Sequence, residues 1–362
     1  MIKKAADEAV PESDCFPGAV HPRETMDLFG HRPAEQEFLE AFRASRMPQA
    51  WLIGGREGIG KATLAWRAAR FVLSYPDPRL PAVQRAQNLF TPEDQPAARR
   101  IIARAHPDVS VLRREWDSKT KKHYTEIRVD DVRKTIGMFH RSAGEGGWRV
   151  AIVDSADDMN KSGANALLKM IEEPPPRCLF FILAHQPGRL LPTIRSRCRK
   201  VMMQSLSESD VIAAIRAQGD EWAQRSDDEL QRAAHRAGGS VLDAMRLMTQ
   251  GSLSMVEKAE SQLARLPAID WRRVHELAAS VQGREGLEGF ETLLATTFDW
   301  IDRTARENAA LPDAPRRLAN LAQVWEKIAA SARETQTFNL DRRPLVLMMF
   351  SDLSEAVRAL RA

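Results

Sequence analysis

Cysteine is scarce in this sequence, and long apolar runs are missing from it. The three cysteines, Cys15, Cys178 and Cys198, stand far apart and form no Cys-x-x-Cys pair. Three scattered thiols cannot build a disulfide framework, and an all-cysteine zinc site needs a fourth, so we expect no zinc. No run of about 18 uncharged apolar residues occurs, which predicts no membrane span. These absences favour a reducing compartment, and we expect a cytoplasmic protein.

A strong excess of charge of one sign is also missing. The chain has 53 basic and 49 acidic residues and a net charge of +4, which supports nucleic-acid contact only weakly. Its 362 residues suggest two or three domains. The first 22 residues mix acids, prolines and bases without an apolar centre, so they do not form a secretory signal. We expect residues 1–22 to be a flexible tail.

Short apolar runs and amphipathic stretches alternate from residue 23 to residue 204. Helical spacing over 34–46 precedes the apolar run AWLIGG, and a second helical pattern covers 62–73. Three further runs predict buried parallel strands: Val109–Leu112, Val150–Val153 and Leu179–Leu183. The polar, basic segment 114–126 between them predicts an exposed hairpin or loop. We therefore expect an α/β P-loop domain with a parallel sheet over 23–204.

Strand patterns stop after residue 204. Residues 205–250 and 251–362 are rich in Ala, Leu, Arg and Glu at a period of 3.6 residues, which predicts helices throughout. We expect a small helical lid over 205–250, divided by the turn at 238–240, and an all-helical domain over 251–362. The tryptophans of that domain are expected to anchor its core: Trp271, Trp300 and Trp325.

GREGIGKAT at 55–63 satisfies most of the P-loop pattern G-x-x-x-x-G-K-[ST]. In such a loop, glycines (here Gly55, Gly58 and Gly60) let backbone N–H groups curl around phosphates at a helix N-terminus. Lys61 would reach the β- and γ-phosphates. The pattern predicts a site for ATP or ADP, although a plain glycine turn between a strand and a helix is the alternative.

The magnesium ligands of this site are incomplete. Ala62 stands where a Ser or Thr hydroxyl should bind Mg²⁺, and Thr63 comes one place late, about 100° further around the helix. Asp154, at the end of an apolar strand, fits the Walker B carboxylate that holds the ion through water. Ser155 follows it where ATPases of this kind carry a glutamate. The pattern thus predicts a degraded Mg²⁺-dependent site.

Residues 160–201 contain NALLKMIEEPPP, the strand FFILA and LLPTIRSRC in that order. Here the chain resembles the bacterial DNA polymerase III clamp-loader subunits, an AAA+ family. The resemblance covers residues 23–250 and extends over 251–362 by position and helicity, where it implies an oligomerisation collar. Arg197 matches the arginine finger that such subunits insert into a neighbouring ATP site.

Two further departures from the family pattern indicate which type of subunit this is. Leu242, in GSVLDA, stands where active motors carry a lid arginine, and residues 71–107 lack the four zinc cysteines that active motors and many delta-prime chains carry. With Ala62 and Ser155, these differences resemble the delta-prime type, a stator that donates a finger in trans with little ATPase activity of its own. The resemblance implies tau/gamma and delta subunits as partners, with the sliding clamp and primed DNA reached through the complex. Lys61 and Asp154 keep the ATP-hydrolysing tau/gamma motor type open, while a non-replicative AAA+ protein and a nucleic-acid binding module are further alternatives.

Overall fold

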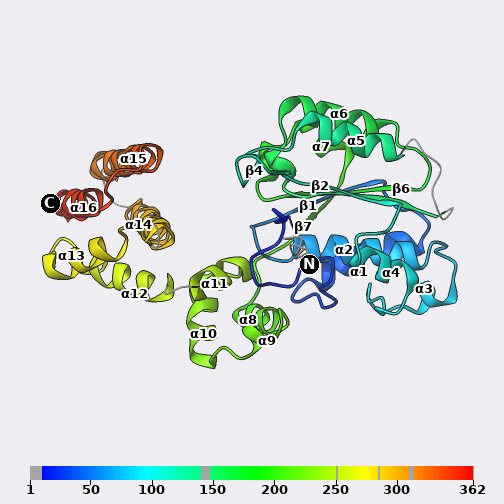
Figure 1. Cartoon of the computed structure of the whole chain (residues 1–362), viewed down its shortest axis with the longest axis horizontal. Coiled ribbons are helices and arrows are strands. Elements are labelled where there is room, and N and C mark those ends of the chain that lie inside the picture. Colours follow the sequence, from blue (N-terminus) through cyan, green and yellow to red (C-terminus); the bar gives the residue numbers. More distant parts are fainter. Residues whose placement is uncertain (1–9, 140–146, 250–251, 284–285, 310–313, 362) are drawn as a thin grey trace, which may run out of the picture. The chain divides into compact units, whose positions relative to one another are not determined.

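The computed structural model describes residues 10–139, 147–249, 252–283, 286–309 and 314–361 (Figure 1). Its contacts divide the chain into two compact units, Met1–Ala244 and Met245–Ala362. The first unit contains the strands together with helices, and the second contains helices among its described residues. The predicted fold class, an α/β P-loop domain followed by helices, is confirmed.

A five-stranded parallel sheet forms the centre of the first unit. Its strand order is β2-β5-β6-β1-β7, and every neighbouring pair is parallel. Three central strands are buried along their whole length, which explains their nearly continuous apolar sequence. The strands are β1 (Ala50–Gly54), β2 (Val109–Leu112), β5 (Arg149–Val153), β6 (Cys178–Ala184) and β7 (Arg199–Met202). The edge strand β7 was not among the predicted strands.

Helices cover both faces of this sheet (Figure 1). One face carries α1 (Arg32–Arg43), α2 (Lys61–Ser74), α3 (Pro81–Arg85) and α4 (Pro96–Ile102). The other carries α5 (Val129–Phe139), α6 (Lys161–Glu172) and α7 (Pro192–Arg197). In α6 the side chain of Asn160 caps the first turn by accepting from the Gly163 N–H, and the helix ends before the predicted proline stop.

The segment before α1 is packed in large part from Glu12 onward, in contrast to the expected flexible tail. The Trp222 indole N–H donates to the Gly18 carbonyl at 2.7 Å, and the Phe16 ring lies 6.2 Å from the Trp222 ring. His21 is 4% exposed and meets Trp66 of α2 edge-on. The first nine residues of the expected tail lie outside the described residues.

Two smaller elements complete the first unit. The strands β3 (Trp116–Asp117) and β4 (Lys122–His123) pair antiparallel, so the hairpin predicted in 114–126 is confirmed. The predicted lid region contains α8 (Glu208–Arg216), α9 (Asp220–Ala223), α10 (Asp227–Arg236) and α11 (Val241–Met248). Ser207 and Ser226 cap α8 and α10 with their side chains. The boundary between the two compact units falls inside α11.

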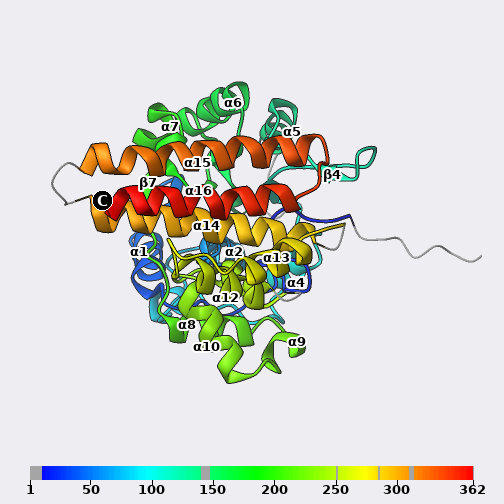
Figure 2. The same cartoon turned by 90° about the vertical axis from the view of Figure 1, so that its left-hand side faces the viewer.

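The second unit is built from α12 (Ser252–Leu263), α13 (Trp271–Ser280), α14 (Leu287–Asn308), α15 (Ala314–Thr337) and α16 (Arg343–Arg361). The three longest helices lie side by side (Figure 2) around apolar residues such as Leu293, Ile328 and Phe350. The prediction that its tryptophans anchor the core is wrong for Trp271 and Trp325, which are 44% and 45% exposed. Trp300 does pack against the core.

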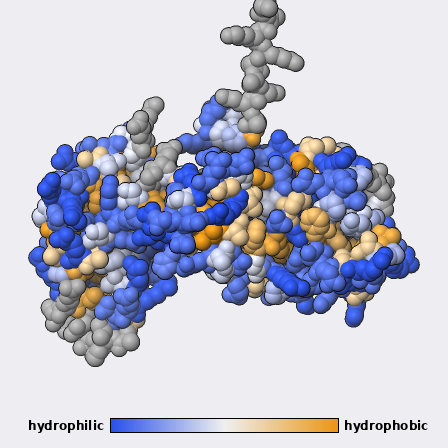
Figure 3. Space-filling model, turned by 90° about the horizontal axis from the view of Figure 1, so that it is seen from below, coloured by the Kyte–Doolittle hydropathy of each residue, from blue (hydrophilic) through white to orange (hydrophobic). Residues whose placement is uncertain are grey.

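The surface seen in Figure 3 is mainly hydrophilic, with scattered apolar patches. Within the described residues, no helix is both long and apolar enough to cross a membrane.

Candidate functional site

The predicted P-loop connects the carboxyl end of β1 to α2. Gly58 has φ +74°, and a Cβ atom at this position would lie 2.4 Å from Leu242 Cβ and 2.5 Å from Ser240 Oγ. Both the backbone angle and the close approach therefore require glycine. Leu242, the residue that replaces the lid arginine, thus packs directly on the loop.

Hydrogen bonds tie the P-loop to the turn before α11. The Val241 N–H donates to the Gly58 carbonyl at 2.9 Å. Arg56 reaches the same turn, donating to the Gly238 carbonyl at 3.1 Å and pairing with Asp243 at 2.8 Å. These contacts join the loop directly to the start of α11.

Lys61 has three N–H donors on its ammonium group, and all three have partners inside the protein. They go to the Gly55 carbonyl at 2.7 Å, the Arg56 carbonyl at 2.5 Å and His185 Nδ1 at 3.0 Å. The residue is 4% exposed, and burial lowers the pKa of Lys61 to about 8. A phosphate would have to replace one of these acceptors.

His185 links the P-loop lysine to the end of β5. Its Nε2 lies 3.0 Å from Ser155 Oγ. When protonated Lys61 donates to Nδ1, the ring proton must be on Nε2, which then donates to the Ser155 hydroxyl. Burial, together with the charge of Lys61, lowers the pKa of His185. Ser155 has φ +53°, and the Asp157 carboxylate accepts from the backbone N–H of His185 at 3.1 Å, so both residues are held in place.

His185 was missed by the sequence reasoning. It directly follows β6, which is the neighbour of β1 in the sheet. The signal that could have found it is a polar side chain at the carboxyl end of a strand adjacent to the P-loop strand, because parallel strands bring such ends to one edge.

Asp154 lies at the same edge of the sheet, at the end of β5. Burial, and after it the charge of Asp14, raises the pKa of Asp154 to about 7. Its backbone N–H donates to the Leu112 carbonyl of β2 at 2.8 Å. Ala62 packs against the apolar core and offers no oxygen to an ion, while Thr63 is half-buried one position further on. The side chains therefore fit a magnesium–nucleotide complex poorly, since magnesium is held by oxygen ligands.

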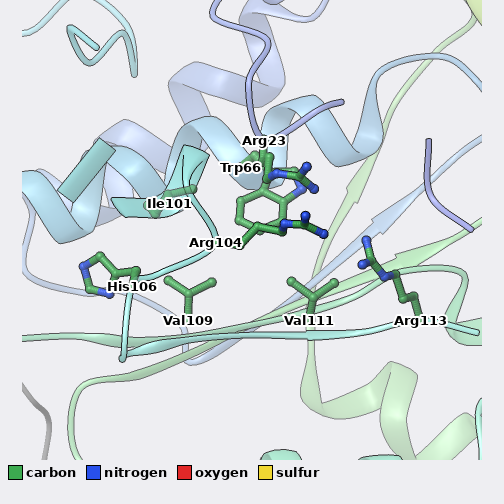
Figure 4. A pocket seen from close by; sticks show the side chains of 8 residues that line it. All are labelled: Arg23, Trp66, Ile101, Arg104, His106, Val109, Val111 and Arg113. Carbon is green, nitrogen blue, oxygen red and sulfur yellow. The ribbon is translucent and has the colours of Figure 1, made fainter. Parts of the chain in front are cut away.

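An arginine-lined pocket of about 130 Å³ lies beside this edge. Its floor is formed by Val109 and Val111 of β2, and its arginines gather at one end (Figure 4). Those arginines are Arg23, Arg104 and Arg113.

The N-terminal segment supplies the acids that neutralise these arginines. Glu12 forms ion pairs with all three arginines, and Asp14 pairs with Arg113. Burial alone would raise the pKa of Glu12, but hydrogen bonds from Arg23 and Arg113 outweigh it and lower that pKa.

His21 adds a possible metal ligand to these two acids, and ligand atoms of Glu12, Asp14 and His21 lie within 4.8 Å of one another. The guanidinium groups already satisfy both carboxylates, which disfavours a cation there.

Arg197 lies at the end of α7 and is separate from the P-loop cluster. Its guanidinium pairs with Glu172 of α6 at 2.9 Å and donates to the Thr193 carbonyl at 3.1 Å. The Arg197 side chain is 43% exposed, and that of Glu172 is 39% exposed. The structure thus brings together Lys61, Asp154 and the P-loop glycines, and it leaves Arg197 at the surface.

Comparison with known proteins places these observations in a family. The family model described as "DNA polymerase III, delta subunit" matches residues 30–207. The delta-prime subunit of DNA polymerase III from Pseudomonas aeruginosa is 36% identical over 207 residues, 56% of each chain. That from Escherichia coli is 28% identical over 300 residues, 80% of this chain and 81% of the relative. The match therefore spans just over half the length of the first relative and four fifths of the second.

More distant relatives include the gamma subunit of DNA polymerase III from Buchnera aphidicola, 25% identical over 63% of this chain and 58% of the relative. Among solved structures, a DNA polymerase III gamma-subunit-related protein from Thermotoga maritima is 19% identical. That alignment covers 88% of this chain and 99% of the other, with a TM-score of 0.39.

Proposed function

We propose that the chain is a DNA polymerase III clamp-loader subunit of the delta-prime type, like the relatives it matches, and that it is the stator subunit of such a complex. In this role it would sit beside an ATP-hydrolysing tau/gamma subunit in an arc that also contains a delta subunit. The arc would use ATP to open a sliding clamp in the cytoplasm and close it on primed DNA. This subunit would contribute a rigid surface and an arginine finger, with negligible ATP turnover of its own.

One observation carries the stator proposal: the nucleotide-binding elements are satisfied by the protein itself. The ammonium of Lys61 has three internal acceptors, and Leu242 packs on Gly58. Ser155, hydrogen-bonded to His185, has no carboxylate to polarise an attacking water. ATP or ADP would thus meet a site that lacks its metal ligands and whose lysine must first exchange partners.

The finger proposal is supported by the weak attachment of Arg197. A half-exposed ion pair such as the one with Glu172 contributes about 0–1 kcal/mol, so the guanidinium can leave it at little cost. A guanidinium carries a permanent charge and a planar fork of donors that matches phosphate oxygens. Placed at a neighbour's ATP site, it would stabilise the charge that develops on the transferred phosphoryl group.

The test is the ATPase rate of a reconstituted complex containing the wild-type or the Arg197→Ala subunit. We expect equal assembly but slower clamp- and DNA-stimulated hydrolysis, and only partial loss, because other motor sites would keep their own fingers. Arg197→Lys should rescue little, since lysine lacks the fork. Arg189→Ala, an exposed arginine on the short helix before α7, is the matched control. Equal rates for the Arg197→Ala and wild-type complexes would exclude the finger.

A tau/gamma-type motor remains the second candidate, because Lys61 and Asp154 keep their motif positions and the gamma relatives align over much of the chain. Turnover by the purified chain separates the two. A rate of about 1 s⁻¹ or faster, in the ordinary enzyme range, would favour the motor.

We further propose that residues 251–362 are the main assembly element. Beyond its own core, this unit exposes apolar side chains that a partner could cover, among them Trp325, Phe338 and Leu340. A chain ending at residue 250 should keep the parallel sheet but fail to join its partners. Normal assembly of this shortened chain would contradict the assignment.

A further inference from the structure

The β3–β4 hairpin is the basic segment to which the proposed function gives no role. It follows β2, at the same carboxyl edge of the sheet as Asp154. Residues 118–124, SKTKKHY, contain three lysines and no acid. Lys119, Lys121 and Lys122 are all exposed, and none of them forms an ion pair among the residues described by the structure.

Hydrogen bonds within the hairpin turn define its conformation. The Asp117 carboxylate accepts from the Lys119 N–H and from the Thr120 hydroxyl, both at 2.9 Å. The Lys121 N–H donates to the Asp117 carbonyl at 2.9 Å. The hydrogen bonds to its carboxylate lower the pKa of Asp117. The carboxylate thus accepts from the backbone and the Thr120 hydroxyl of the turn, and it forms no ion pair with a lysine of the turn. The lysine side chains are therefore held out on a fixed scaffold.

The base of the hairpin is fixed to the body of the sheet domain. Arg114 pairs with Asp158 at 3.5 Å, and the Ile127 N–H donates to the Asp158 carbonyl at 3.0 Å. The basic side chains at the base are thus used inside the protein: Arg113 pairs with the N-terminal acids, Arg114 with Asp158, and Arg128 with Asp131. The three tip lysines differ from them in facing solvent without an acidic partner.

The aromatic rings of the hairpin are already in contact with other side chains of the protein. Trp116 and His123 meet edge-on with centroids 4.9 Å apart, and the Arg128 guanidinium lies 3.9 Å from the centroid of the Tyr124 ring. Bases that stack on a protein need an open aromatic face. The hairpin therefore offers point charges more readily than stacking platforms, which favours contact with a phosphate backbone over contact with bases.

We propose that the β3–β4 hairpin is a sequence-independent contact for the phosphate backbone of duplex DNA, made by Lys119, Lys121 and Lys122. This inference rests on the proposed function, in which the complex closes a clamp on DNA. Three lysines on one hairpin would neutralise up to about three phosphates and release their counterions, which is the source of salt-dependent binding.

The experiment compares the full-length wild-type chain with the variant Lys119→Ala/Lys121→Ala/Lys122→Ala. A matched control removes three positive charges elsewhere, in Lys200→Ala/Lys258→Ala/Arg272→Ala, all of them exposed. Binding of a labelled 30-base-pair duplex and of a 30-nucleotide single strand, both of mixed sequence, is followed by fluorescence anisotropy from low to moderate salt.

In the hairpin variant, we expect the duplex affinity to fall by about tenfold or more at low salt. The slope of log affinity against log salt should become shallower by about 2 to 3, because each phosphate contact contributes about 0.9. The charge control should retain nearly the wild-type slope. Equal loss in both variants, no DNA binding by the wild type, or binding confined to the single strand would overturn the proposal.

Assembly with tau/gamma and delta subunits is measured on the same proteins. Wild-type assembly of the hairpin variant together with reduced DNA affinity would support the DNA contact. Unchanged DNA affinity with weakened assembly would assign the hairpin to an acidic protein surface and overturn the proposal. Failure of the wild-type chain to assemble would instead count against the stator function, while the direct DNA titration would still test the hairpin.

Discussion

Replacement of His185 by alanine tests whether the P-loop lysine is satisfied by the protein itself. The variant removes one of three acceptors from the buried Lys61 ammonium and leaves one N–H donor without its partner at 3.0 Å. An unsatisfied buried donor costs about 1–3 kcal/mol. We therefore expect His185→Ala to lower the free energy of unfolding of the first unit by that amount.

A double-mutant cycle separates the Lys61 bond from the other contacts of His185. In a Lys61→Met background the ammonium is gone, so His185→Ala should lose only its bond to Ser155 and its packing. The two substitutions should therefore couple by about 1–3 kcal/mol, whereas independent sites add within about 0.5 kcal/mol. Lys61→Met alone removes a charge that burial disfavours. It also leaves the Gly55 and Arg56 carbonyls and His185 Nδ1 without their donor, so the coupling and not the single effect carries the test.

Urea unfolding at pH 7, monitored by hydrogen exchange of the sheet amides, reports on the first unit separately from the second. His185→Asn is the conservative control, since its amide oxygen can accept from Lys61 if it reaches. Additive effects of the two substitutions would refute the assignment of His185 as an acceptor for the Lys61 ammonium.

Three further predictions concern the electrostatics of the first unit. The pKa of Asp154, raised from 3.8 to about 7, should make the wild type lose stability as pH rises from about 4 to 7, by at most about 4 kcal/mol. Asp154→Asn should abolish that dependence in urea unfolding at several pH values. Asp14→Asn should cost about 2–3 kcal/mol near neutral pH by leaving Arg113 without one acid. Because the pKa of Asp14 is lowered, that difference should disappear as melting is followed to acid pH, and persistence would contradict it. Glu172→Gln should free Arg197 from its ion pair. In the reconstituted complex the ATPase rate should equal that of the wild type or be up to about fivefold higher, since the exposed pair is weak. A large fall in that rate would assign Glu172 a positioning role.

Much of the sheet could be predicted because its central strands β1, β5 and β6 are buried on both faces. The run Val109–Leu112 coincides with β2, and the other two runs differ from β5 and β6 by one residue at one or both ends. The edge strand β7 escaped prediction because its sequence, RKVM, has a single buried residue and reads as a polar end of the preceding helix. Edge position, which only the tertiary structure reveals, removes the apolar signature.

The site could be predicted only in part, for a similar reason. The P-loop and Asp154 follow a local spacing that the sequence displays. His185, which contacts Lys61, comes 124 residues after it in the sequence. Asp14, which adds to the effect of burial in raising the pKa of Asp154, belongs to the N-terminal segment. No local sequence pattern connects either residue to the P-loop. The N-terminal segment resembled a tail because its acids and prolines look solvated in isolation. Its order depends on Arg104, which follows α4, on Arg113, which follows β2, and on Arg23 of the segment itself.

The contrast between Lys61 and Arg197 explains how one chain could lose a reaction in its own site and still serve a neighbour's. Lys61 is buried, and each of its bonds is expensive to leave unmade, so binding of a nucleotide must compete with a complete set of internal acceptors. Arg197 is half-exposed, and its acidic partner is equally accessible to water, so exchange for a phosphate oxygen costs little. Selection for a stator would remove the metal ligands of the P-loop site without any penalty to Arg197, because Lys61 and Arg197 share no contact partner among the described residues.

The substitution Ser155→Glu alone should therefore fail to create ATP turnover, since Ala62, Leu242 and the bonds of Lys61 would remain. Turnover on the order of 1 s⁻¹ in that variant would show that the internal acceptors are no barrier.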